Sequence, residues 1–230
     1  MTGTTNPIRA VFSLPPEDLD HADYEAWYPG HMRDILTVPG IGSARLYRAA
    51  AGVGKGSPTV YPYVALYEIV GEPAETLSAL DAALGSDQVP LPGFFGDVRW
   101  AVYDLDAIDE IRHAHTLDGD ALYFVFSAPP AGTSAEDYEA WYHTHVRENV
   151  EIGELAAAHR WDLTASLVDP LLPPHATHLA TYELTAGPRA MNLLLDTAIR
   201  EGRIVLPEWF PGINFASVST TAVTDRIEAA

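Results

Sequence analysis

Two histidines of this chain each end a run of aromatic residues on a predicted helix. At 3.6 residues per turn, the members of each run share one face of their helix. The two runs are Tyr24, Trp27, Tyr28 and His31, and Tyr138, Trp141, Tyr142 and His145. An imidazole in such surroundings can hold a pKa near neutral pH and act as a general acid or base. We expect His31 and His145 to be catalytic and the aromatic side chains to stack on a substrate. The alternative is a structural histidine bonded to a backbone carbonyl.

The C-terminal part of the chain carries further histidines that could join His145. His178 lies on a predicted strand, and His159 opens another. If both side chains face the helices, they converge on His145 as additional catalytic candidates, although a one-residue change of register would turn them away. His143 and His145 are two residues apart, so on a regular helix they point in different directions. We therefore predict no metal site.

Absent residues and motifs narrow the chemistry further. The 230 residues include no cysteine, which excludes disulfides, thiolate nucleophiles and cysteine-based metal sites. The sequence has no phosphate-binding loop, dinucleotide fingerprint, zinc-protease motif or nucleophile elbow. We therefore predict a protein that needs no cofactor and acts on a small molecule.

Charge and hydropathy exclude other classes of partner. The formal net charge of −19 repels a phosphate backbone, which argues against nucleic-acid binding. No run of about 18 apolar residues is present, so we expect no membrane span. The N-terminus has no basic segment followed by an apolar one, which argues against a secretory signal. We expect a cytoplasmic protein that could form a homodimer.

The aromatic runs belong to an internal repeat. Asp23–Tyr28 (DYEAWY) recurs unchanged as Asp137–Tyr142, an offset of 114. After the helix an offset of 115 aligns Arg45 with Arg160. Duplication of a whole domain explains this pattern. We predict one domain over residues 1–106, a linker over 107–119 and a second domain over 120–230. The two arginines could hold a carboxylate or enolate oxygen of the substrate, or form surface ion pairs.

Each half is predicted to run β-α-β-β-α-β. In the first half the strands cover about 8–13, 44–50, 60–70 and 98–104, and the helices about 20–37 and 73–84. In the second half the strands cover about 122–127, 159–167, 177–184 and 213–220, and the helices about 134–151 and 188–201. Pro29 should kink or end the first helix. The strand of residues 63–69 is apolar on both faces, so we expect the two four-stranded antiparallel sheets to cover each other.

The sequence resembles the dimeric α/β-barrel superfamily. The DYEAWY motif before His31, the segment Val38–Ile41, Arg45 and the segment Tyr61–Glu68 are similar to its EthD-like branch. The resemblance covers nearly all of the first half and most of the second. It implies an α+β fold of two ferredoxin-like repeats, packed as a pseudo-dimeric barrel within one chain. It also implies a functional histidine at His31 and His145.

The relatives in this superfamily suggest several functions. They include muconolactone isomerases, polyketide cyclases, quinone-forming monooxygenases, EthD-type decarboxylases and, more distantly, haem enzymes. Our leading hypothesis is a cofactor-independent enzyme that moves a proton on an aromatic or polyketide-like substrate, as a cyclase, isomerase, dehydratase or decarboxylase. The alternatives are a cofactor-free quinone-forming monooxygenase, a haem-binding enzyme, and a non-catalytic binding or scaffolding protein whose interior has no cavity beside the first helix.

Overall fold

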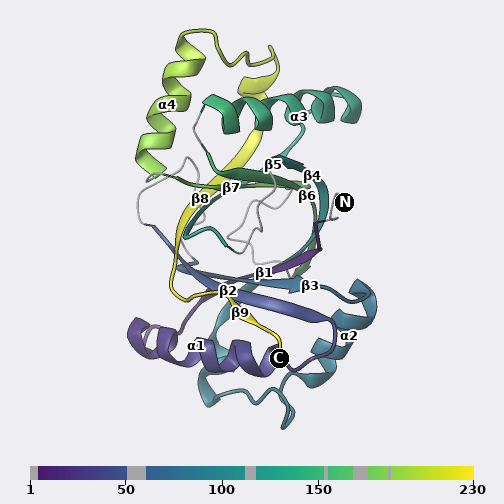
Figure 1. Ribbon diagram of the computed structural model, residues 1–230, viewed down its shortest axis with the longest axis vertical. Helices are drawn as coiled ribbons and strands as arrows, with labels where there is room; N and C mark the ends of the chain where they lie inside the picture. The colour runs from purple at the N-terminus through teal and green to yellow at the C-terminus, as the bar shows by residue number, and fades with distance from the viewer. Residues whose placement is uncertain (1–4, 51–60, 112–117, 153–154, 168–175, 186–187) are drawn as a thin grey trace.

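Each half of the chain forms the same series of elements in the computed structural model (Figure 1). The structure describes residues 5–50, 61–111, 118–152, 155–167, 176–185 and 188–230. The first half comprises β1 (Ile8–Leu14), α1 (His21–Ile35), β2 (Ile41–Ala49), β3 (Tyr63–Ile69), α2 (Pro73–Ala83), a 3-10 turn (Gly93–Asp97) and β4 (Arg99–Ile111). The second comprises β5 (Ala121–Ala128), α3 (Ala135–Ile152), β6 (Ala157–Leu167), β7 (His178–Glu183), α4 (Pro188–Arg200), a 3-10 turn (Phe210–Gly212), β8 (Asn214–Ala222) and β9 (Ile227–Glu228).

The strands β1–β8 close into an eight-stranded antiparallel barrel. The strand order is β2-β3-β1-β4 in the first half and β6-β7-β5-β8 in the second. The halves join along both edges, through β4 with β6 and through β2 with β8. Closure pairs edge strands that would otherwise expose unpaired backbone groups. The two sheets were expected to cover each other, and they do so by pairing their edge strands into one closed barrel.

The closure uses more of β4 than the sequence suggested. This strand continues to Ile111 and pairs with β6 as far as Ala158. Part of the segment predicted as a linker over 107–119 therefore belongs to the sheet. A further short strand, β9, pairs with the start of β2 through Ser43 and Glu228. The sequence pattern did not predict β9.

Large side chains fill the interior of the barrel. Every residue of β3 is buried, as its two apolar faces predicted. Val64 and Leu66 point into the barrel, where Phe12 from the first half meets Phe124 from the second at 6.0 Å between ring centroids. Tyr67 points out of the barrel, toward α1. The described residues thus pack the interior of the barrel as a core, and the pockets beside α1 and α3 lie outside it.

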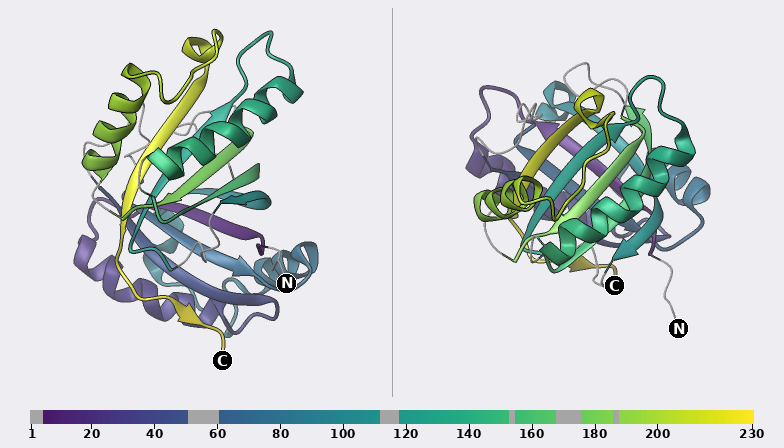
Figure 2. Two further views of the ribbon diagram at one scale, coloured as in Figure 1. Left: turned by 45° about the horizontal axis from the view of Figure 1, so that its top comes forward. Right: turned by 90° about the horizontal axis from the view of Figure 1, so that it is seen from above.

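The helices cover the outer faces of the strands. Figure 1 shows α1 and α2 on one side of the barrel and α3 and α4 on the other, and Figure 2 shows α3 and α4 lying across the strands of the second half. Asp20 caps α1 by accepting a hydrogen bond from the Ala22 amide, and Ser134 caps α3 by accepting one from the Asp137 amide. The described helices are all too short or too polar to reach across a lipid bilayer.

Pro29 does not end α1. The helix continues through it to Ile35. Proline removes one backbone donor and normally disrupts a helix interior. Here the residues around it, among them Tyr28, His31 and Met32, are buried against the sheet, and this packing holds the last turns in place. The prediction that the helix could end at Pro29 is therefore wrong.

Candidate functional site

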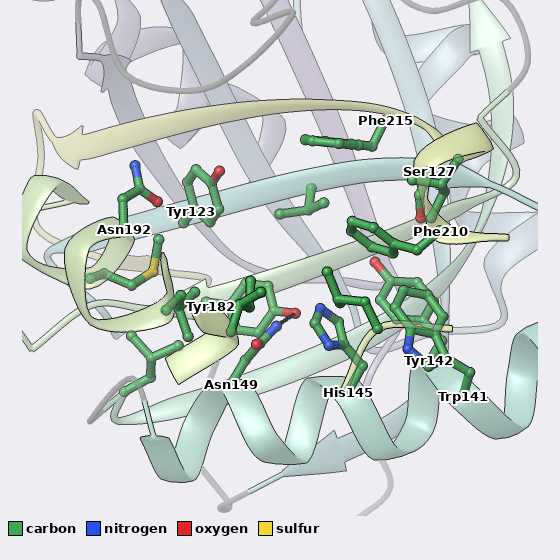
Figure 3. Close-up of a pocket in the computed structure, with 17 residues that line it drawn as sticks. Tyr123, Ser127, Trp141, Tyr142, His145, Asn149, Tyr182, Asn192, Phe210 and Phe215 are labelled. Carbon is green, nitrogen blue, oxygen red and sulfur yellow. Dashed lines mark hydrogen bonds between the residues drawn. The ribbon is translucent and has the colours of Figure 1, made fainter. Parts of the chain in front are cut away.

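Each half has a cavity, partly open to solvent, between its first helix and the outer face of its strands. The cavity of the second half, beneath α3 and α4, measures about 140 Å³, and that of the first half measures about 210 Å³. The second-half cavity is lined, among others, by Trp141, Tyr142, His145, Asn149, Tyr182 and Phe210 (Figure 3). The first-half cavity is lined, among others, by Arg9, Tyr28, His31, Tyr67, Phe95 and Trp100. Both predicted histidines thus line a cavity.

One wall of the second-half cavity is aromatic. The His145 ring stacks on Trp141 with centroids 4.7 Å apart and an interplanar angle of 19°. Phe210 meets Trp141 edge-on at 5.6 Å. A cavity of about 150 Å³ lined by apolar side chains holds one benzene molecule. The aromatic wall and the similar volume therefore suit one aromatic ring.

The His145 imidazole is neutral at neutral pH. Burial lowers its pKa from 6.5 to about 4, because the charged form would lose its hydration. Its Nδ1 atom is buried and has no hydrogen-bond partner among the described residues. Nε2, the ring nitrogen farther from the backbone, makes none of the described contacts and is not enclosed. Figure 3 shows the ring extending from α3 into the cavity.

A polar pair lies one turn further along α3. The Asn149 amide donates a hydrogen bond to the Tyr182 hydroxyl at 3.1 Å, and both side chains are buried. Burial raises the pKa of Tyr182 well above its usual value of 10, so the hydroxyl keeps its proton. Asn149 takes the place that Ile35 has in the first half, and this difference between the repeats was the only signal of the pair in the sequence.

Three other predicted residues form a cluster beside the cavity instead of lining it. Arg160 forms an ion pair with Glu139, and its guanidinium carbon lies 4.8 Å from the centre of the Tyr142 ring. His178 Nε2 contacts the same carboxylate at 2.6 Å. The Tyr138 hydroxyl donates to Ser127. Because Glu139 already binds the cation, Arg160 is poorly placed to hold a substrate anion.

The strand pairings correct the match between the two predicted arginines. Leu46 pairs with Ala65 of β3, and Arg160 pairs with Ala180, which is the equivalent of Ala65 in β7. Arg160 therefore corresponds to Leu46 and not to Arg45. The offset of 114 persists through this strand, and the extra residue of the second half lies in the loop that follows. The alignment of Arg45 with Arg160 was wrong by one residue.

A shift of one residue moves a side chain to the other face of its strand. Arg45 corresponds to His159, and neither side chain lines either cavity. Arg45 donates to the Asp118 carbonyl at 2.7 Å and pairs with the Asp120 carboxylate at 2.6 Å. His159 stacks on Trp161, whose ring belongs to the barrel core. The expected convergence of His159 on His145 does not occur.

The first-half cavity repeats the stacked histidine with other surroundings. His31 stacks on Trp27 at 4.7 Å and 20°, and its pKa is also lowered to about 4 by burial. Arg9 lines this cavity, but its guanidinium binds Asp104 through contacts of 2.8 and 3.1 Å. Tyr24 is buried behind the cavity wall. This cavity therefore pairs a neutral histidine with a neutralised arginine.

The described residues contain no group of three or more histidine, aspartate, glutamate or cysteine side chains placed to hold a metal ion. The polar groups of the second-half cavity are imidazole, amide and hydroxyl, with no charged side chain among the described lining residues. This arrangement can bind a neutral aromatic molecule and exchange hydrogen bonds or a proton with it.

Comparisons with known proteins concern the fold. No family model and no curated protein matches this chain. An anthrone oxidase-like protein superposes with a TM-score of 0.61 at 12% identity, over 100% of this chain and 95% of that one. A variant of chlorite dismutase from Candidatus Nitrospira defluvii gives 0.59 at 9%, over 96% and 92% of the chains. A protein named as a monooxygenase from Lactobacillus acidophilus NCFM gives 0.53 at 13%, over 98% and 100%. The chain therefore has the dimeric α/β-barrel fold that its sequence resembles.

Proposed function

We propose that the second-half cavity is the active site of a small enzyme that acts on an aromatic substrate by acid–base chemistry, without a cofactor. The reaction class is isomerisation, cyclisation, dehydration or decarboxylation. The observation that carries the proposal is the His145 imidazole, which is neutral, stacked on Trp141 and free of hydrogen-bond partners among the described residues. An enzyme must keep such a group available for its substrate.

The pKa of His145 is lower than the near-neutral value expected from the sequence, because burial disfavours the charged ring, and the imidazole is therefore neutral at pH 7. With a pKa of about 4, fewer than about one molecule in a thousand carries the imidazolium at pH 7. A neutral imidazole donates a hydrogen bond from one nitrogen and accepts at the other. Nε2, the ring nitrogen that is open to the cavity, can therefore give a proton to a substrate in one tautomer and take a proton in the other. Trp141 and Phe210 would hold the reacting ring against it.

The test is proton exchange on a small carbon acid. Acetophenone combines one aromatic ring, for which the cavity has room, with an acidic methyl group. In deuterium oxide, the protein should accelerate the replacement of methyl hydrogen by deuterium, followed by proton NMR. Acid–base catalysis by one side chain contributes about 100-fold or more, so His145→Phe should remove most of the acceleration. Ring-hydroxylated acetophenones extend the panel.

The first half supplies the matched control. His31→Phe changes the equivalent histidine of the other cavity and should leave the exchange unchanged. Phenylalanine preserves the stacking on Trp141 or Trp27, so the two variants differ only in which cavity loses its imidazole. Equal exchange rates in the wild type and in His145→Phe would remove the assignment.

A cofactor-free oxygenase is the second candidate. The neighbours named as anthrone oxidase-like and as a monooxygenase favour it, together with the aromatic wall around His145. In this reaction the substrate loses a proton to become a carbanion, dioxygen adds to the carbanion to give a hydroperoxide, and loss of water leaves the quinone oxygen on that carbon. Uptake of dissolved oxygen with dihydroxybenzenes, measured with an oxygen electrode, separates this reaction from the first proposal.

Haem does not fit the cavities as they stand. A cavity of about 150 Å³ holds one benzene molecule, whereas a porphyrin is a macrocycle of several linked rings. The volumes of about 140 and 210 Å³ are therefore too small unless α1 or α3 moves away from the sheet. We derive no step through haem.

The repeat history and the branch of the superfamily are also proposals. The same element order in both halves supports a duplication of one ferredoxin-like unit, and the DYEAWY motif before each stacked histidine supports the EthD-like branch. The non-catalytic binding or scaffolding protein was expected to have no cavity beside the first helix of either half. The cavities beside α1 and α3 therefore favour a catalytic role over that alternative.

A further inference from the structure

The position of Nδ1 in His145 decides where the neutral ring carries its proton. A proton on Nδ1 would bury an N–H group that has no acceptor among the described residues. A buried donor without an acceptor costs about 1–3 kcal/mol, and orphaned N–H groups are rarer than acceptors with an unused lone pair. The neutral ring therefore carries its proton on Nε2 at rest, and in this tautomer His145 is a hydrogen-bond donor toward the cavity. Moving the proton to Nδ1 costs about 1–3 kcal/mol and frees Nε2 to take a proton from the substrate.

Tyr182 supplies a second donor in the same cavity. Its hydroxyl oxygen accepts from Asn149, which leaves the O–H itself to donate. It donates to none of the described residues, and burial keeps it protonated. Asn149 thus fixes the hydroxyl from behind, as a positioning residue. In Figure 3 the Tyr182 hydroxyl, the Asn149 amide and the His145 ring point toward one another.

We propose that His145 Nε2–H and the Tyr182 hydroxyl form a two-donor site for one carbonyl oxygen, so that the second-half cavity takes an aromatic carbonyl compound: an aryl ketone, an aryl aldehyde or a quinone. The ring of such a ligand lies against Trp141 and Phe210, opposite the donors. A neutral imidazole and a phenol polarise a carbonyl without needing a charge of their own. The inference rests on the proposed function and names its substrate class.

The absence of charge at this site selects against carboxylates. No described lining residue is charged, and Arg160, whose guanidinium lies over the lining residue Tyr142, is bound to Glu139. Bringing a carboxylate into such surroundings costs several kcal/mol without a paired cation. The overall charge of −19 adds repulsion. Acetophenone should therefore bind and benzoate should not, although the two are similar in size.

The carbonyl stretching band of acetophenone measures the two hydrogen bonds directly. Carbonyl-labelled acetophenone bound to the protein should show its infrared band at lower frequency than in an apolar solvent. In Tyr182→Phe and in His145→Phe the carbonyl frequency should each time move part of the way back toward its value in the apolar solvent. Each variant should also bind acetophenone about fivefold more weakly, which is the effect of one neutral hydrogen bond. Ethylbenzene has nearly the same shape and no carbonyl, so its affinity should not change in Tyr182→Phe.

Two further variants keep the test independent of folding defects. Asn149→Ile installs the residue found in the first half, and it should return a smaller part of the shift because the Tyr182 hydroxyl loses its support. Tyr67→Phe removes the equivalent hydroxyl of the first-half cavity and should leave the bound spectrum unchanged. Nitrogen-15 NMR of the histidine ring should place the His145 proton on Nε2.

Three results would overturn the proposal: an unshifted carbonyl band, equal weakening of acetophenone and ethylbenzene binding in Tyr182→Phe, or a His145 proton on Nδ1. Its failure is distinguishable from that of the proposed function. Deuterium exchange that depends on His145 but not on Tyr182 would support the proposed enzyme activity and refute the two-donor site. A shifted carbonyl band without any deuterium exchange would support the carbonyl-binding site and refute the proposed reaction.

Discussion

The two buried histidines should make the fold sensitive to acid in a defined pH window. Burial lowers the pKa of His31 and of His145 from 6.5 to about 4. Between these values the unfolded chain binds more protons than the folded one, so stability rises with pH. The full stability is present above pH 6.5 and falls as the pH drops toward 4. Below pH 4 this contribution levels off, because both states are protonated.

The size of the effect follows from the shifts. One pKa unit corresponds to about 1.4 kcal/mol, so each histidine can remove at most about 3 kcal/mol. Between pH 7 and pH 5 the loss is about 2 kcal/mol for each histidine, and about 4 kcal/mol for both. A domain with about 5–15 kcal/mol of stability would lose a large share of it.

Urea unfolding followed by tryptophan fluorescence at pH 7 and pH 5 measures this loss. His31→Phe and His145→Phe should each reduce the pH dependence by about 2 kcal/mol, and the double variant by about 4 kcal/mol. Carboxylates titrate in all four proteins, so their contribution cancels in the comparison. The same pH dependence in the wild type and in the double variant would show that these imidazoles are not desolvated, and the reasoning on the site would fail with it.

Three further outcomes are expected. Phe12→Ala should destabilise the protein by about 3–5 kcal/mol in urea unfolding, because it empties the contact between the two halves inside the barrel. Glu139→Gln should cost about 2 kcal/mol by the same measurement, since it leaves the buried Arg160 cation without its ion pair while Glu139 itself is partly exposed. The exchange rate with acetophenone should stay constant from pH 6 to 8 and fall only near pH 4, where His145 becomes charged, and His159→Gln should leave it unchanged because that ring lies against the barrel core.

The sequence predicted the features that depend on periodicity. The alternation in β3 indicated a strand buried on both faces, and the 3.6-residue spacing of Trp141 and His145 indicated that both belong to one helix face. Such patterns report which side of an element is buried, and burial is what the fold has to satisfy. Because the sequence repeats, the same buried faces could be assigned in both halves.

Features that depend on register between distant segments were harder to predict. The second half has one more residue than the first between its first helix and the strand β7. Sequence identity alone placed this extra residue before β6, whereas the strand pairings place it after β6, and this misaligned Arg45 with Arg160. The sequence left open which side of its strand His178 faces; the residue faces the helices, where Glu139 of α3 binds it. Sequence patterns contain no information on which neighbouring element satisfies a polar side chain.

The two cavities share the stacked histidine and differ in the residues of the opposite wall, which determine the ligand. The histidine stacked on a tryptophan at 4.7 Å is the same in both halves, and its geometry comes from the i and i+4 positions of one helix. The opposite wall comes from other elements, where Arg9 lies across from Tyr67 and Tyr123 across from Tyr182.

Because both halves lie in one chain, each wall can differ without any change in its counterpart, which two identical subunits could not achieve. The difference between Ile35 and Asn149 is one such change, and Asn149 orients a hydroxyl that the ligand can use. The Asn149→Ile variant therefore tests more than one hydrogen bond. If the second half then binds acetophenone no better than the first, this single position accounts for the difference in ligand between the two cavities.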